Sequence, residues 1–180
     1  MIVGIDIGNK GGWVGIGDAA EVVKAGKLPE MHDSSDDLEL HVLVTEWLLL
    51  EATVVYMEGA PGNVRIKGRS NPAGLRSLAL WEGLLRGACA SRLRVVIVPY
   101  GTWKVAVLGR RDATKDDAIA LCRSRWPNAD EWLIPPGCRV PQDGIADAAC
   151  IATYGWGLER FGLTGSGLLA RYRGSSRRSR

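Results

Sequence analysis

Short apolar runs rich in β-branched residues constrain the fold of this chain more than any other feature. Three of them read MIVGIDIG, ATVVYMEG and LRVVIVP, and each ends in a glycine or a proline. Runs of this length and composition are typical of strands buried inside a sheet. Between the first run and the second, GWVGIG and AEVVKAGKL predict two further strands of an antiparallel meander.

Helical patterns fill most of the remaining sequence. The predicted helices cover residues 35–50, 71–91, 101–108, 113–125 and 143–160. A connecting segment with prolines and tryptophans is expected over 126–142. Three strands followed by alternating helices and strands imply an α/β fold, with a mixed five-stranded sheet and helices on both faces. We expect one domain over 1–162 and a flexible basic tail over 163–180.

Charge is distributed unevenly along the 180 residues, although the formal net charge is only +3. Residues 1–58 carry three Lys and Arg against eleven Asp and Glu, whereas residues 59–180 carry twenty against nine. One basic cluster is Arg65, Lys67 and Arg69, and another is the terminal RYRGSSRRSR. Such clusters are typical of proteins that bind a phosphate backbone, so the first is predicted to contact DNA. A solvated loop and a disordered solubilising tail are the respective alternatives.

The four cysteines are scattered and form no C-x-x-C pair. This pattern favours reduced thiols in a cytosolic protein over a disulfide framework or a zinc site. The N-terminus lacks the basic-then-apolar pattern of a signal peptide, and no apolar run reaches the ~18 residues of a membrane span. We therefore expect a cytoplasmic location and no membrane partner.

Acidic residues fall at three points where the predicted framework is otherwise apolar. Asp6 lies inside the first strand, Glu58 ends a later strand before a glycine, and Asp143 and Asp147 open the last helix. The four-residue spacing puts the last two on one helix face, where like charges repel by ~0.2–0.5 kcal/mol. In an apolar setting the penalty is larger, because a desolvated carboxylate needs a counter-charge.

These acids would converge if the first and fourth strands were neighbours and the last helix packed across their ends. Four carboxylates without a basic partner form a hard-oxygen site suited to Mg²⁺ or Mn²⁺. Two such ions ~3.5–4 Å apart can activate a water and stabilise the leaving oxygen of a phosphodiester. The alternative is unrelated surface acids at element ends, which helix starts favour. Asp6 is the acid least compatible with that alternative.

Several motifs together resemble the RuvC-type Holliday-junction resolvases of the ribonuclease H-like superfamily, in particular their phage and prophage branch. The motifs are GIDIG, VVYMEG, VPYGTWK…ATKDDA and DGIADAACIATYG, and they occur in the family's order over nearly the whole chain. The resemblance implies a ribonuclease H-like fold and a homodimer that acts on branched DNA in a bacterial host cell. Each subunit would nick one of two symmetric strands of a four-way junction.

The resemblance also implies roles for individual residues. The acids that match the ligands of two Mg²⁺ or Mn²⁺ ions, and are catalytic, are Asp6, Glu58, Asp143 and Asp147. Lys104 and Lys115 match two basic residues that flank the site and contact DNA or support catalysis. Lys10 and Trp103 are also expected to contact DNA.

Two features depart from the bacterial enzyme. Its last two acids are separated by three residues, whereas Asp143 and Asp147 are separated by four. It also carries an aromatic residue after its catalytic glutamate, whereas residues 59–80 here contain no Phe, Tyr or Trp. The second departure leaves open a less structure-selective nuclease of the same fold that cuts branched or flap DNA.

Two other classes of function fit parts of the sequence. The stretch GIDIGNKGG resembles the phosphate-binding opening of the actin and sugar-kinase group, where it cradles ATP phosphates. That fold is much longer and has a second phosphate loop, which this chain lacks. A non-catalytic DNA-binding module is disfavoured because four acids facing DNA repel phosphate unless metal ions neutralise them. A metal-dependent endonuclease is therefore the predicted function.

Overall fold

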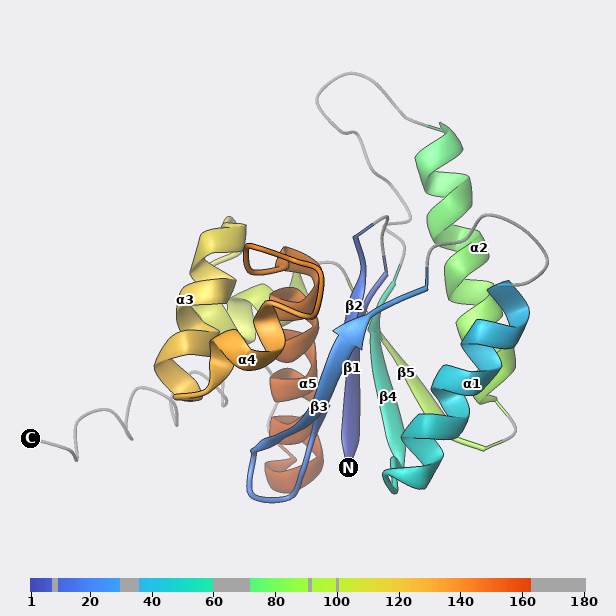
Figure 1. The fold of residues 1–180 in the computed structure, drawn as a ribbon, viewed down its shortest axis with the longest axis horizontal. Coiled ribbons are helices and arrows are strands. Elements are labelled where there is room, and N and C mark those ends of the chain that lie inside the picture. The colour runs from blue at the N-terminus through green and yellow to red at the C-terminus, as the bar shows by residue number, and fades with distance from the viewer. Residues whose placement is uncertain (8–9, 30–35, 60–71, 91, 100, 163–180) are drawn as a thin grey trace, which may run out of the picture.

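The computed structural model describes residues 1–7, 10–29, 36–59, 72–90, 92–99 and 101–162. Five strands form one sheet in the order β3-β2-β1-β4-β5 (Figure 1). The strands are β1 (Ile2–Asp6), β2 (Gly12–Ile16), β3 (Val22–Lys27), β4 (Val54–Glu58) and β5 (Arg94–Val98). The first three are antiparallel neighbours, whereas β4 runs parallel to both β1 and β5. The predicted mixed sheet with an opening meander is confirmed.

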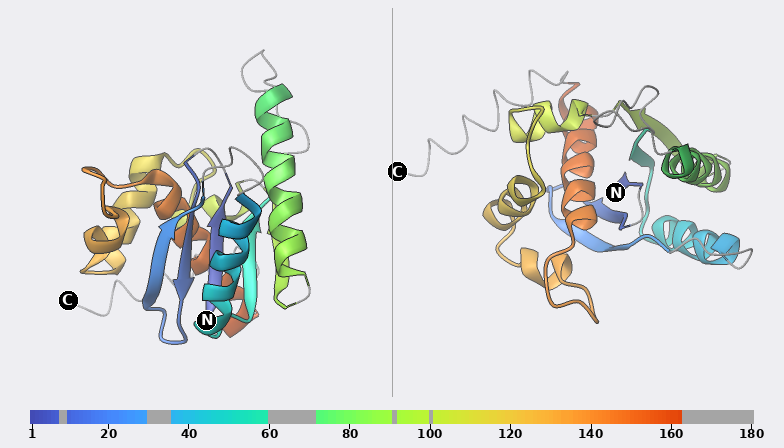
Figure 2. Two further views of the ribbon diagram at one scale, coloured as in Figure 1. Left: turned by 45° about the vertical axis from the view of Figure 1, so that its right-hand side comes forward. Right: turned by 90° about the horizontal axis from the view of Figure 1, so that it is seen from above.

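Helices cover both faces of this sheet, as predicted (Figure 2). They are α1 (Asp36–Leu49), α2 (Pro72–Cys89), the π-helix η1 (Lys104–Leu108), α3 (Lys115–Arg125), α4 (Ala129–Leu133) and α5 (Asp143–Phe161). On one face, α1 and α2 bury side chains such as Trp47 and Trp81. On the other face, α5 lies against the sheet, and α3, α4 and η1 complete a second core around it.

Alternation along β1 divides its residues between the two cores. Val3 and Ile5 are fully buried on the face covered by α1 and α2. Gly4 and Asp6 alternate with them and therefore face α5. A Cβ atom at Gly4 would lie 2.3 Å from the backbone carbonyl oxygen of Ala148. The missing side chain thus allows the backbone of α5 to rest directly on β1.

A second close approach fixes the start of α5 beside the turn between β1 and β2. Gly11 and Gly144 form an isolated parallel β-bridge, and a Cβ atom on Gly144 would lie 1.9 Å from the carbonyl oxygen of Lys10. Towards the other end of α5, the hydroxyl of Tyr56 donates to Oε1 of Glu159 at 2.5 Å. These contacts attach α5 to the sheet near both of its ends.

Two local features differ from the sequence prediction. The segment 126–142, predicted as a connection, contains the short helix α4, which is anchored by the fully buried Leu133. Five residues are too few to reveal a helical period, so packing rather than pattern defines this helix. The piece predicted at 101–108 is helical, but from Lys104 onward it is a π-helix, and apolar periodicity does not distinguish the two forms.

The sequence also predicted the state of the cysteines, the lack of membrane-spanning segments and the limits of the domain. All four cysteines are free, and Cys89, Cys122 and Cys150 are buried. Within the described ranges, no helix has the length and apolar character needed to cross a membrane. The single domain over 1–162 stays a prediction, and the tail over 163–180 lies outside the described residues.

Candidate active site

Asp6 and Glu58 end two neighbouring parallel strands at the same edge of the sheet. Ile5 of β1 pairs with Met57 of β4, and each acid is the next residue along its strand. Tyr56 belongs to the core around α5, so Glu58, two residues later, lies on the same face. Both carboxylates therefore project from the sheet towards α5.

Asp143 and Asp147 lie in the first turns of α5, where the helix meets the turn between β1 and β2. The negative charges of these two residues act on Asp6 at the end of β1. Burial raises the pKa of Asp6 to about 8, and the negative charges of Asp147, Glu58 and Asp143 add to the rise. The structure thus brings the four predicted carboxylates within electrostatic reach of one another.

Asp147 is the second acid whose charged form is disfavoured. Burial raises its pKa to about 6, with Glu58 and Asp143 adding to the rise and Lys104 and Lys115 opposing it. Its Oδ1 oxygen is buried and has no hydrogen-bond partner among the described residues. A buried carboxylate oxygen without a donor is destabilising unless a proton or a cation meets it.

Two lysines bring positive charge to this cluster. Lys115 forms an ion pair with Asp143. Burial acts to raise the pKa of Asp143, but the hydrogen bond and charge of Lys115 outweigh it and the pKa is lowered. The charge of Lys104 opposes the rise in the pKa of both Glu58 and Asp147. The two predicted basic residues therefore lie beside the predicted acids.

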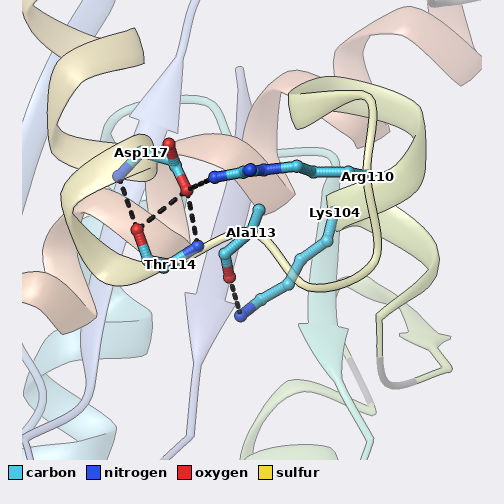
Figure 3. A network of polar contacts seen from close by, with 5 residues as sticks. All are labelled: Lys104, Arg110, Ala113, Thr114 and Asp117. Atoms are coloured by element: carbon cyan, nitrogen blue, oxygen red, sulfur yellow. Dashed lines mark hydrogen bonds and ion pairs between the residues drawn. The ribbon is translucent and has the colours of Figure 1, made fainter.

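A network of polar contacts holds the loop between η1 and α3 in place (Figure 3). The ammonium group of Lys104 donates to the carbonyl oxygen of Ala113 at 3.2 Å. Thr114 and Asp117 form a capping box at the start of α3, and Arg110 pairs with Asp117 at 2.5 Å. The cap fixes where α3 begins and hence where its first residue, a lysine, is presented. This network was not predicted, although the Thr-x-x-Asp spacing was an available signal.

Trp103 lies inside the molecule, and the prediction that it contacts DNA is wrong. Its side chain is only 1% exposed, and its indole N–H donates to Oε1 of Glu58 at 2.7 Å. Burial raises the pKa of Glu58, whereas this bond, a longer one from the backbone of Gly101 and the charge of Lys104 oppose the rise. The residue therefore touches an acid of the site instead of solvent.

The donor set suits a hard divalent cation. It consists of carboxylate oxygens, the ligands that Mg²⁺ and Mn²⁺ prefer. Among the described residues no donor meets Oδ1 of Asp147, and burial together with the neighbouring carboxylates raises the pKa of Asp6. In the described part of the chain, no three Asp, Glu, His or Cys side chains are gathered closely enough to enclose an ion. Asp143 is paired with Lys115, so binding of a cation by this acid requires the ion pair to rearrange.

Among the remaining predicted DNA contacts, Lys10 lies within the described residues and the cluster at 65–69 does not. Lys10 is exposed in the turn after β1, and its charge helps to lower the pKa of Asp143. It therefore lies on the side of the molecule that carries the acids. Arg65, Lys67 and Arg69 fall outside the described residues, so their role stays a prediction.

Solved structures with a similar fold include RuvC from Thermus thermophilus, at 18% identity and a TM-score of 0.58, with 91% of this chain and 97% of RuvC covered. The fold is that of RuvC. The structure of T. thermophilus RuvC in complex with a Holliday junction substrate gives a TM-score of 0.57 at 19% identity, covering 84% of this chain and 89% of that one. The yeast mitochondrial Holliday junction resolvase Ydc2 gives 0.51 at 16% identity, covering 98% and 83%.

The likeness to RuvC is one of structure. No family model and no curated protein sequence matches the chain. Because nearly the whole of RuvC is covered, the shared architecture includes the sheet and the helices on both of its faces. The predicted ribonuclease H-like fold is thereby confirmed.

Proposed function

We propose that this chain is a metal-dependent endonuclease that nicks branched DNA and resolves Holliday junctions by paired, symmetric incisions. The observation that carries the proposal is the burial of Asp6 beside three other carboxylates, which raises its pKa to about 8. Such an arrangement costs stability at neutral pH unless cations compensate it, so it is typical of a functional site. The fold shared with RuvC supports the proposal, since a RuvC structure contains a Holliday junction substrate.

The four acids would bind cations, and the two lysines would bind the DNA phosphate. The residues that would hold two Mg²⁺ or Mn²⁺ ions are Asp6, Glu58, Asp143 and Asp147. The chemistry that such ions supply when bound is activation of a water and stabilisation of the leaving oxygen of a phosphodiester. Lys104 and Lys115 would bind the phosphate and offset its negative charge. The ion pair with Asp143 keeps Lys115 at the site before DNA arrives.

Paired incisions need two active sites related by a twofold axis, so we propose that the chain acts as a homodimer. Lys10 is exposed beside the acids and would contact the DNA backbone. Arg65, Lys67 and Arg69 would extend this contact along the backbone. We also propose that the protein acts in the cytoplasm of a bacterial host cell.

The test uses the purified chain with Mg²⁺ or Mn²⁺ on labelled four-way junctions, flaps and linear duplexes of matched sequence. We expect symmetric nicks in the junction that EDTA abolishes. Asp6→Asn should lose cleavage but keep junction binding in a mobility shift, whereas Asp18→Asn, at an exposed turn, should cleave normally. Cleavage by the Asp6→Asn variant would refute the assignment. Wild-type binding without cleavage would favour the DNA-binding module, and faster cutting of flaps would favour the less selective nuclease.

A further inference from the structure

A hydrogen bond from a buried indole links Trp103 to one acid of the proposed site. The indole N–H lies 2.7 Å from Oε1 of Glu58, and the Trp103 side chain is 1% exposed. The backbone N–H of Gly101 approaches the same oxygen at 3.5 Å. A short bond to a charged acceptor is strong in a low-dielectric setting, and it fixes the rotation of the carboxylate.

The same indole also lies against the cation of the next residue. The ammonium nitrogen of Lys104 is 5.2 Å from the centroid of the Trp103 ring, which is within the range of a cation–π contact. Trp103 immediately precedes the π-helix η1, a helical form that is frequent at functional sites. One buried ring thus touches both an acid and a base of the site.

A second tryptophan in the same core provides a direct comparison. Trp126 is 7% exposed, and its indole N–H donates to the backbone carbonyl of Ala20 at 2.9 Å. The two residues differ in the acceptor, which is a backbone oxygen for Trp126 and a carboxylate of the site for Trp103. Because an indole donates a hydrogen bond and cannot accept one, Trp103 holds Glu58 without competing for a cation.

We propose that Trp103 is a positioning residue that holds Glu58 in the orientation in which this carboxylate takes up a divalent cation. The inference rests on the proposed function, because it takes Glu58 as a ligand. Residues that bond to a metal ligand typically contribute about 10- to 100-fold in metal affinity or activity. Trp103→Phe should therefore weaken Mn²⁺ binding by about 10- to 100-fold and lower the kcat of junction cleavage to a similar degree. The Kd for the junction in EDTA should not change.

The experiment is a calorimetric titration of Mn²⁺ into six proteins of verified fold. Five of them are the wild type, Trp103→Phe, Trp126→Phe, Glu58→Gln and the double variant Trp103→Phe/Glu58→Gln, and the sixth carries 3-benzothienylalanine in place of Trp103. Trp126→Phe removes an equivalent buried N–H bond away from the acids and should bind Mn²⁺ as the wild type does. Trp103→3-benzothienylalanine replaces the N–H by sulfur at nearly unchanged ring size, so it tests the hydrogen bond even if Trp103→Phe does not fold.

Each result bears on the proposal. A weaker affinity in both Trp103 variants, with no further weakening when Trp103→Phe is added to Glu58→Gln, would support it. Unchanged affinity, or an equal weakening in the Glu58→Gln background, would overturn it, even if the wild type cleaves junctions as proposed. A wild type that binds Mn²⁺ through this pair but cuts no DNA would refute the proposed function alone. A wild type that binds no Mn²⁺ would overturn both.

Discussion

Lys115 and Asp143 form an ion pair that joins the first residue of α3 to the first residue of α5. This pair lowers the pKa of Asp143, whereas burial raises the pKa of Asp6, Glu58 and Asp147. One acid of the cluster is therefore compensated by a cation of the chain itself. Because a DNA phosphate would compete for the same lysine, substrate binding and release of Asp143 are expected to be linked.

Removal of Lys115 tests whether this lysine contributes to cleavage. Lys115→Met should reduce the single-turnover rate of junction cleavage by about 10²–10³-fold, since it removes a positive charge that we propose lies at the scissile phosphate. Junction affinity should change much less. Lys24→Met is the matched control, because Lys24 forms an ion pair with Glu46 on a different part of the surface. Equal reductions in the two variants would contradict a specific role for Lys115.

The stability of the metal-free chain should fall as the pH rises. The pKa of Asp6 is about 8 in the folded chain against an ordinary value of 3.8, so between these values the folded state holds a proton that the unfolded state has released. Stability is then greatest below about pH 4 from this group and declines towards pH 8. Asp147, with a pKa of about 6, adds a smaller decline over a narrower range.

Asp6→Asn should remove most of that decline and stabilise the metal-free chain at pH 8. Urea unfolding in EDTA at pH 5 and pH 8 measures the effect, and Asp18→Asn provides an exposed control. Saturating Mg²⁺ should stabilise the wild type at pH 8 more than the Asp6→Asn variant, because only the folded state offers the complete site. Equal wild-type stability at the two pH values would disprove the pKa argument.

Two glycine substitutions should have opposite effects on the free energy of unfolding, because one glycine lies at the contact between β1 and α5 and the other lies in open space on α2. Gly4→Ala should destabilise the chain by about 1–3 kcal/mol or more, because its Cβ would meet the backbone of α5 at 2.3 Å. Gly83→Ala, in α2, should instead stabilise it by ~0.5–1 kcal/mol, since nothing lies within 4 Å of the new atom and alanine favours helix. Chemical denaturation measures both, and a neutral Gly4→Ala would mean that the helix can shift away from the strand.

The salt dependence of binding tests the basic cluster at Arg65, Lys67 and Arg69. Their combined replacement by alanine should weaken junction binding and flatten its salt dependence, by up to ~0.9 log unit per log unit of salt for each DNA phosphate that the variant no longer binds. Titrations from low to moderate salt measure the slope. A control with the same change of charge replaces Lys24, Arg86 and Arg123. An unchanged slope in the first variant would exclude the cluster from the DNA interface.

Much of the framework was predictable because it follows from local pattern. The β-branched runs predicted the strands, including the two that end with Asp6 and Glu58. The apolar surroundings that the sequence predicted for Asp143 and Asp147 are present, with Ile145 and Ile151 fully buried. These features depend on residues close together in the sequence, so periodicity and turn chemistry were sufficient.

The details of the site were not predictable because they depend on distant partners. Trp103 is next to Lys104 in the sequence, but the direction of its indole depends on a hydrogen bond to Glu58. That residue lies on β4, 45 residues earlier in the chain. The pairing of Lys115 with Asp143 likewise joins two helix starts that only the tertiary fold brings together. Adjacency in sequence indicated which residues are near the site, but not which of them touch each other.

The position of α5 has a consequence for the order in which the protein matures. Two of the four acids lie on this helix, whereas the other two lie at the ends of β1 and β4. A nascent chain that has emerged from the ribosome only as far as residue 142 contains all five strands but only two of the four acids of the proposed cation site. Gly4 also leaves a bare strip of backbone on the sheet until α5 docks. Until α5 is added, the chain would lack half of the ligands proposed for cation-dependent cleavage, so the proposed nuclease activity would appear only once this helix has docked.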